Sequence, residues 1–256
     1  MANELLIARD VSMVFGGLRA VVDFNVHIRR GELLGLIGPN GAGKTTAFNL
    51  FTGVYQPTTG EILFKEKSIV GLSPYQITAR GIARTFQNIR LFGELSVRDN
   101  VKIAFHTHMN YGLTEAILRI GRYWSEEKHL EEEAHRLLSI FHLEHLAEEQ
   151  AKNLPYGAQR RLEIARALAA QPQLLLLDEP AAGMNPQETQ ELMEMIRWVR
   201  KEFGLTILLI EHDMSLVMGI CERIYVLEYG AIIANGTPED IRQNPEVIRA
   251  YLGAEE

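Results

Sequence analysis

The segment from Gly38 to Thr45 has the glycine and lysine spacing of a phosphate-binding loop. Its small residues let backbone N–H groups approach phosphate oxygens, and a helix starting near Lys44 would direct its positive end at the anion. Lys44 adds a point charge, and the Thr45 hydroxyl is a suitable Mg²⁺ ligand. We therefore predict that the phosphate groups are bound by Gly38, Pro39, Asn40, Gly41, Ala42, Gly43, Lys44, Thr45 and Thr46.

Two acidic residues follow a second apolar segment. Leu174–Leu177 runs directly into Asp178 and Glu179. Ligands of open α/β sheets bind at the carboxyl edge of the strands, where these acids would lie. By itself such a strand is a common entry into a loop. Beside a phosphate loop it predicts that Asp178 holds Mg²⁺ through water and that Glu179 orients or deprotonates the attacking water.

His212 and Gln87 are two further polar candidates. His212 lies just past the apolar run Thr206–Ile210, so we expect it at the same sheet edge, where it could donate to a γ-phosphate and hold water in line. Gln87 follows the short run 82–86 and, without context, is more typical of a solvated loop amide.

The elements that position these residues follow from hydrophobic patterning. Apolar runs without alternation predict strands buried on both faces, hence a parallel sheet covered by helices in an α/β fold. These runs are Glu32–Ile37, Leu174–Leu177, Thr206–Ile210 and Arg223–Glu228. Near the start, Leu5–Val14 and Ala20–Ile28 predict an antiparallel pair of strands around the turn Gly16-Gly17.

The middle of the chain, from about Ser96 to Ala151, has almost no strand signal. Ser96 to Asp99 fits a capping box that opens a helix, and Ser125–Phe141 has apolar residues at helical spacing. We therefore expect a helical subdomain inserted into the α/β part. Near the end, Thr237 to Asp240 predicts a helix start, preceded by a turn at Asn235-Gly236.

Composition excludes several function classes. The 256 residues contain 26 Lys and Arg against 33 Asp and Glu, and a net charge of −7 argues against binding to nucleic acid. The single Cys221 excludes an internal disulfide framework and a cysteine-rich zinc site. We find no secretory signal and no apolar run of about 18 residues that could cross a bilayer.

One further motif is Leu154–Arg161, which reads Leu-Pro-Tyr-Gly-Ala-Gln-Arg-Arg. With the phosphate loop and the polar candidates described above, it makes the chain resemble the ATPases of ATP-binding cassette (ABC) transporters. The resemblance covers essentially the whole chain. The resemblance implies a P-loop (RecA-like) core that uses ATP and Mg²⁺. It implies that the loop at Lys44 is the Walker A motif, with Asp178 in Walker B, Glu179 as catalytic carboxylate and His212 as switch histidine. It also implies that Thr45, Gln87 and Asp178 serve the metal. Phe15 would lie against adenine or, alternatively, pack in the core of the hairpin.

The same resemblance divides the chain and narrows its function. It implies an ATP-binding core formed by 1–87 and 160–256, and a helical subdomain, 88–159, that ends in the signature motif. Segments 16–20, 163–166 and 244–253 are similar to the LivG type of ATP-binding subunit, which serves branched-chain amino-acid importers. Alternatives are ATPases of urea or amide import or lipopolysaccharide-type export, a non-transport ABC ATPase, and a nucleotide-binding regulator without hydrolysis.

The signature motif departs from the family pattern. The family begins it with Leu-Ser-Gly-Gly, whereas here Pro155 and Tyr156 replace the serine and the first glycine, and Asn185 replaces an aspartate further on. In the family two cassettes sandwich each ATP, so Gly157 would act in trans. A weakened signature suits a heterodimer with a second ABC ATPase. Alternatively, Pro155 is merely a good first-turn residue and both sites of a homodimer work.

The resemblance also implies membrane partners. The loop from Ile89 to Leu95 is unusually apolar, and we expect it to receive transmembrane permease subunits or, alternatively, to pack inside the helical subdomain. A solute-binding protein would take part indirectly, and nucleic acid would not. The expected location is peripheral, on the cytoplasmic face of the inner (plasma) membrane.

Overall fold

The computed structural model describes residues 3–105, 121 and 123–252, which pack as two compact units. The first unit contains 1–87 and 173–256, and the second contains 88–172. Helix α6 (Tyr156–Ala169) packs against α3 (Val97–Phe105) and belongs wholly to the second unit. The boundary that we expected at 159/160 therefore falls inside a helix, and the packing boundary lies at 172/173.

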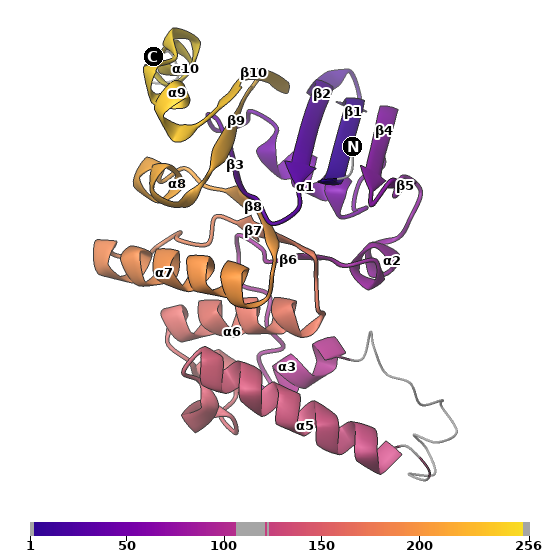
Figure 1. Cartoon of the computed structure of the whole chain (residues 1–256), viewed down its shortest axis with the longest axis vertical. Helices are drawn as coiled ribbons and strands as arrows, with labels where there is room; N and C mark the ends of the chain where they lie inside the picture. The colour runs from indigo at the N-terminus through magenta and orange to yellow at the C-terminus, as the bar shows by residue number, and fades with distance from the viewer. Residues whose placement is uncertain (1–2, 106–120, 122, 253–256) are drawn as a thin grey trace. The chain divides into compact units, whose positions relative to one another are not determined.

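A six-stranded sheet of order β10-β9-β3-β8-β7-β6 forms the centre of the first unit (Figure 1). Its five strands from β9 to β6 are parallel, as the unbroken apolar runs predicted, and β10 joins β9 antiparallel at the edge. The strands are β3 (Leu33–Ile37), β6 (Ile82–Arg84), β7 (Leu174–Asp178), β8 (Thr206–Ile210), β9 (Arg223–Glu228) and β10 (Ala231–Gly236).

An antiparallel sheet of order β2-β1-β4-β5 forms the N-terminal part of the same unit. Its strands are β1 (Glu4–Phe15), β2 (Leu18–Arg29), β4 (Thr59–Phe64) and β5 (Lys67–Ser68). The predicted hairpin between β1 and β2 is confirmed, and Gly16 and Gly17 make its turn at φ 51° and 101°, where glycine is favoured.

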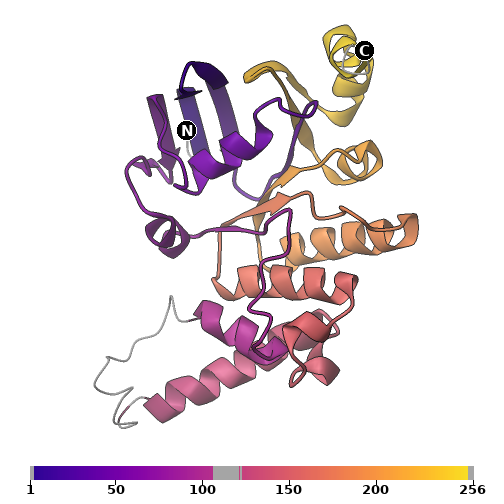
Figure 2. The same ribbon diagram turned by 180° about the vertical axis from the view of Figure 1, so that it is seen from behind.

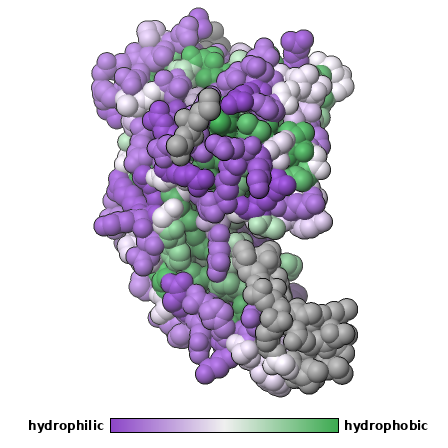
Figure 3. All heavy atoms as spheres, turned by 45° about the vertical axis from the view of Figure 1, so that its right-hand side comes forward, coloured by the Kyte–Doolittle hydropathy of each residue, from purple (hydrophilic) through white to green (hydrophobic). Residues whose placement is uncertain are grey.

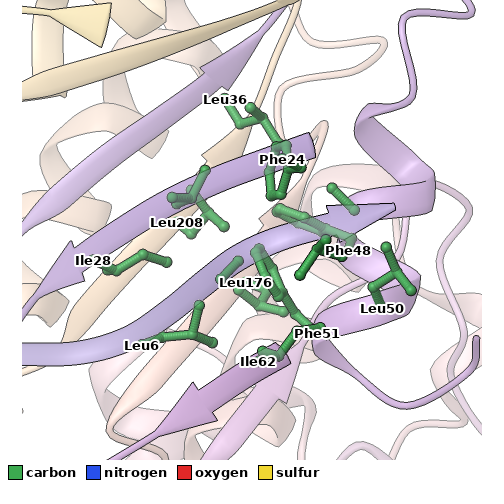
Figure 4. Packing of buried hydrophobic residues seen from close by; sticks show 14 of the residues in the cluster. Leu6, Phe24, Ile28, Leu36, Phe48, Leu50, Phe51, Ile62, Leu176 and Leu208 are labelled. Atoms are coloured by element: carbon green, nitrogen blue, oxygen red, sulfur yellow. The ribbon is translucent and has the colours of Figure 1, made fainter. Parts of the chain in front are cut away.

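Helix α1 (Lys44–Phe51) is fixed between the two sheets by a hydrophobic core. Figure 4 shows Phe48 and Phe51 of α1 among side chains from β1, β2, β3, β4, β7 and β8. On the other face of the parallel sheet, a Cβ at Gly35 would lie 3.1 Å from Cys221 Sγ and 3.3 Å from Val217, so α8 (Met214–Ile220) packs closely there. The remaining helices of this unit are α2 (Pro74–Ala79), α7 (Pro186–Glu202), α9 (Pro238–Gln243) and α10 (Pro245–Leu252).

The second unit is helical where the structure describes it. It contains α3, α5 (Tyr123–Ile140), α6 and two short 3₁₀ turns, Glu144–Leu146 and Ala151–Asn153 (Figure 2). Ser96 caps α3 as predicted, because its Oγ accepts a hydrogen bond of 3.0 Å from the Asp99 N–H. Residues 106–120 and 122 of the expected helical subdomain lie outside the described residues.

The predicted turn at Asn235-Gly236 is wrong. Both residues belong to β10, where Asn235 pairs with Tyr225 and Gly236 with Ile224 across the antiparallel ladder. The local turn propensity of these residues is overridden by pairing at an open sheet edge. The helix start that follows is confirmed, since Thr237 and Asp240 form a capping box at α9.

Among the described residues, no helix combines the length and apolarity needed to cross a membrane. The face visible in Figure 3 is largely hydrophilic, with apolar side chains gathered in separate patches.

Candidate functional site

The loop between β3 and α1 depends on glycine at two positions. A Cβ at Gly38 would lie 2.0 Å from Leu227 O, and one at Gly43 would lie 2.4 Å from Ala20 O. Both glycines also have positive φ values, 151° and 105°. Any larger residue would push the loop away from β9 and β2, so the glycines keep a small, backbone-lined cradle at the start of α1.

Lys44 lies across this cradle. Its Nζ donates to Gly38 O at 2.6 Å and to Pro39 O at 2.9 Å, and the residue is only 7% exposed. Burial lowers the pKa of the Lys44 ammonium, while the nearby Glu179 and Asp178 oppose that shift. Thr45 is exposed in the first turn of α1, so its hydroxyl is accessible to a ligand of the loop.

Asp178, at the end of β7, is held by an arginine that the sequence analysis did not identify as a site residue. Arg84 Nη2 donates to Asp178 Oδ2 at 2.6 Å, and both side chains are almost fully buried. Arg84 Nη1 also donates to Asn49 Oδ1 at 2.7 Å, and the guanidinium lies against the rings of Phe48 and Phe86. A charged residue at the end of the otherwise buried strand β6 was the available signal.

Two predicted site residues, Gln87 and His212, meet at the carboxylate of a third, Glu179. Gln87 Nε2 donates to Glu179 Oε2 at 2.6 Å, and His212 Nδ1 lies 3.8 Å from the same oxygen. The backbone of Glu179 has φ +46°, a left-handed conformation that costs a non-glycine residue about 1–3 kcal/mol and is typical of functional sites. Its own N–H donates to Ile210 O at 2.9 Å, which links the ends of β7 and β8.

Glu211 forms a second link between these strand ends. It is 1% exposed, and its Oε1 accepts from the Ala181 N–H at 2.7 Å. Its Oε2 accepts from the N–H groups of His212 at 3.2 Å and Asp213 at 3.5 Å. Burial raises the pKa of the Glu211 carboxyl, and the three N–H groups oppose that shift. The sequence analysis did not assign a role to Glu211.

Phe15 lies at the turn end of the N-terminal hairpin, where it pairs with Leu18. Its residue is 38% exposed, and its ring meets the ring of Tyr55 edge-on with centroids 5.0 Å apart. Phe15 is therefore outside the buried core, and its aromatic ring is partly accessible.

The signature segment lies at the start of α6 in the second unit. Pro155 precedes the first helical residue, and its carbonyl oxygen accepts from the N–H groups of Ala158 and Gln159. Gly157 is partly exposed, and no atom lies within 4 Å of a Cβ built there, so packing within the described chain does not require glycine.

The arginines after the signature do not form a simple basic patch. Arg160 and Glu163 form a buried ion pair of 2.9 Å, with side-chain exposures of 0% and 1%. Glu163 Oε1 also accepts from the Arg90 N–H at 3.3 Å, which ties α6 to the loop from 89 to 95. In that loop the Phe92 backbone exchanges two hydrogen bonds with Asn100, yet Phe92 is 50% exposed.

The oxygen groups of the site fit magnesium better than a metal that needs many protein ligands. Among the described residues there is no cluster of three or more His, Cys, Asp or Glu side chains suited to a metal. Magnesium commonly binds through one or two protein oxygens, water and substrate phosphates, so the Thr45 hydroxyl and the Asp178 carboxylate beside a phosphate loop are suitable donors.

Known proteins resemble the chain along nearly its whole length. It is 51% identical over 254 residues to the high-affinity branched-chain amino acid transport ATP-binding protein LivG of Salmonella typhimurium, covering 99% of both chains. It is 46% identical to the corresponding protein BraF of Pseudomonas aeruginosa, again over 99% of both.

A solved structure and two families agree with these relatives. The crystal structure of the ADP conformation of MJ1267, an ATP-binding cassette of an ABC transporter, superposes with a TM-score of 0.85, at 29% identity and over 98% of this chain and 99% of that one. The Branched-chain amino acid ATP-binding cassette transporter family matches residues 231–256, and the ABC transporter family matches residues 21–182. The chain therefore belongs to the ABC transporter family, as one of its ATP-binding cassettes.

Proposed function

We propose that this chain is the ATP-hydrolysing subunit of an importer for branched-chain amino acids. The observation that supports hydrolysis most directly is the meeting of Gln87 and His212 at the carboxylate of Glu179, in the same unit as the glycine cradle. The import of branched-chain amino acids is supported by 51% identity to a transport protein of that name over 99% of both chains.

In this proposal the backbone of residues 38–43, with Lys44, binds the β- and γ-phosphates of ATP. Magnesium bound to Thr45, Asp178 and Gln87 would neutralise charge on those phosphates. Glu179 accepts a proton from the attacking water, and the Gln87 amide holds that carboxylate in place. His212 donates toward the γ-phosphate. Phe15 stacks on adenine.

Transport requires that ATP favours one arrangement of two cassettes. ATP that contacts the loop of one chain and the signature of another binds the closed pair more tightly than the open pair, and hydrolysis removes that preference. Gly157 contributes its N–H in trans. Pro155 offers neither a hydroxyl nor an N–H, so we propose a heterodimer in which the second ABC ATPase carries a fuller signature.

The exposed Phe92 and the apolar loop around it support contact with a permease, because an exposed aromatic group on a pinned backbone is suited to docking. The chain would then act peripherally on the cytoplasmic face of the inner membrane, and a solute-binding protein would reach it only through the permease.

The test is reconstitution of the complete transporter in vesicles. We expect ATP-dependent uptake of leucine, isoleucine or valine, and loss of uptake in a Lys44→Ala variant. ATP-dependent transport of urea, an amide or a lipopolysaccharide in place of these amino acids would assign the chain to another ABC system. Nucleotide binding without phosphate release would assign it to the non-hydrolytic regulators.

A further inference from the structure

Glu211 is a buried carboxylate to which the mechanism above gives no role. It directly follows β8, and Ala181, which it contacts, lies three residues beyond the end of the neighbouring strand β7. Each of these two strand ends carries one catalytic candidate, Glu179 on β7 and His212 on β8. Glu211 therefore lies where the two segments must be held in register.

The hydrogen bonds of Glu211 use both of its oxygens as acceptors. Oε1 accepts from the Ala181 N–H at 2.7 Å, and Oε2 accepts from His212 N–H at 3.2 Å and Asp213 N–H at 3.5 Å. All three partners are backbone donors, so an ionised carboxylate matches them and a carboxamide does not. Replacing Glu211 with glutamine keeps the shape but turns one acceptor into a donor that faces other donors.

The backbone at Glu179 supplies the reason for such a link. Its φ of +46° is unfavourable for glutamate and persists only where neighbouring groups hold it. The bond from Ala181 to Glu211 lies two residues beyond Glu179, and the bond from Glu179 N–H to Ile210 O lies just before Glu211. These two bonds fasten Glu179 and Ala181 to adjacent residues, Ile210 and Glu211, at the end of β8.

From this arrangement we infer that Glu211 is a positioning residue that keeps Glu179 and His212 close enough to act on one water. The inference rests on the proposed hydrolytic function and deepens it. Glu211 accepts its hydrogen bonds from three backbone N–H groups, and its Oε2 also lies 3.9 Å from Nδ1 of the His212 ring. Its effect on the reaction therefore passes through the loops that carry Glu179 and His212.

The first test is Glu211→Gln in the full chain, assembled with the other transporter subunits. Because a small misplacement of reacting groups can cost about 100-fold in rate, we expect kcat to fall about 10- to 100-fold. KM for ATP should stay within about twofold, since the phosphate cradle is untouched. Glu32→Gln is the control for loss of a buried carboxylate elsewhere: Glu32 accepts from the Arg29 N–H and from the Arg223 guanidinium, and it precedes β3, at the opposite end of that strand from the cradle.

A double-mutant cycle and hydrogen exchange distinguish a positioning role of Glu211 from a general contribution to stability. If Glu211 acts through His212, adding Glu211→Gln to His212→Ala should lower kcat much less than it does in the wild type. In the isolated full chain, Glu211→Gln should speed amide exchange in peptides that contain Ala181 and His212, while Glu32→Gln should not.

An unchanged kcat, a loss that multiplies fully with His212→Ala, or unchanged exchange at these peptides would overturn the inference. A wild-type complex without ATP turnover would instead contradict the proposed function, and the exchange measurement would still decide whether Glu211 holds the two segments.

Discussion

The two acids at the end of β7 are held in different ways, and this difference matches their proposed roles. Asp178 is buried and fixed by the Arg84 guanidinium at 2.6 Å, so its oxygens have little freedom. Glu179 is partly exposed and contacts the side chains of Gln87 and His212, both of which are exposed. A metal ligand benefits from a fixed position, whereas a general base must reach water.

The one cysteine provides a residue-level test of the fold around β3. Burial raises the pKa of the Cys221 thiol to about 12, with a further contribution from Glu222. Because the thiolate is the reactive form, we expect iodoacetamide at pH 8 to modify the folded chain about 10³-fold more slowly than the chain in denaturant. Mass spectrometry over time measures both rates, and equal rates would contradict the packing of Cys221 against Gly35.

At the scale of elements, we expect helix α6 to lose much stability when one partner of its buried ion pair is removed. Arg160→Met removes the charge that neutralises Glu163, and we expect about 3–5 kcal/mol less free energy of unfolding. Replacing both residues, as Arg160→Met with Glu163→Leu, should recover much of that loss. Urea denaturation followed by circular dichroism measures each variant.

The control for this prediction is Arg136→Met. Arg136 and Glu133 form a similar pair of 3.0 Å on α5, but their side chains are 52% and 29% exposed, so we expect a loss below about 1 kcal/mol. Equal losses for the Arg136 and Arg160 variants would show that burial of the α6 pair carries no special cost.

A variant in the loop from 89 to 95 should separate the coupling of ATP hydrolysis to transport from nucleotide binding. Phe92→Asp places a charge on an exposed ring position whose backbone is pinned by Asn100, so the second unit should stay folded. We expect transport to be lost while the isolated chain still binds nucleotide. Loss of nucleotide binding, measured by fluorescence with a labelled ATP analogue, would favour a packing role for Phe92.

Elements were more predictable from the sequence than the contacts between them. Unbroken apolar runs identified β7, β8 and β9 because burial on both faces leaves a strong local pattern. The pairing of β10 at residues 235–236 was missed because Asn-Gly favours a turn locally, whereas pairing with Tyr225 and Ile224 of β9 keeps the two residues extended. Arg84 and Glu211 were missed because their partners lie 94 and 30 residues away in sequence.

At the scale of the whole molecule, the altered signature predicts unequal ATP sites. If Pro155 weakens the site that it faces in another cassette, the purified chain alone should hydrolyse ATP slowly, and adding the second ABC ATPase should raise the rate per chain. Phosphate release at equal total chain concentration makes this comparison. Equal activity per chain in both samples would support the alternative, in which both sites of a homodimer work.

The net charge of −7 says little about this chemistry, because the phosphate cradle depends on glycine geometry and one lysine. The lack of a membrane-spanning helix among the described residues likewise says little about whether the chain acts at a membrane. In the proposed function, partner subunits cross the membrane and this chain acts on them.

The central claim is that Glu179 drives ATP hydrolysis, and phosphate release by the Glu179→Gln variant of the assembled transporter tests it most directly. Glutamine keeps the size of the side chain but cannot accept a proton from water. We predict that the variant still binds Mg-ATP and loses about 10²- to 10⁴-fold in turnover. Turnover at the wild-type rate would remove Glu179 from the mechanism and contradict the account.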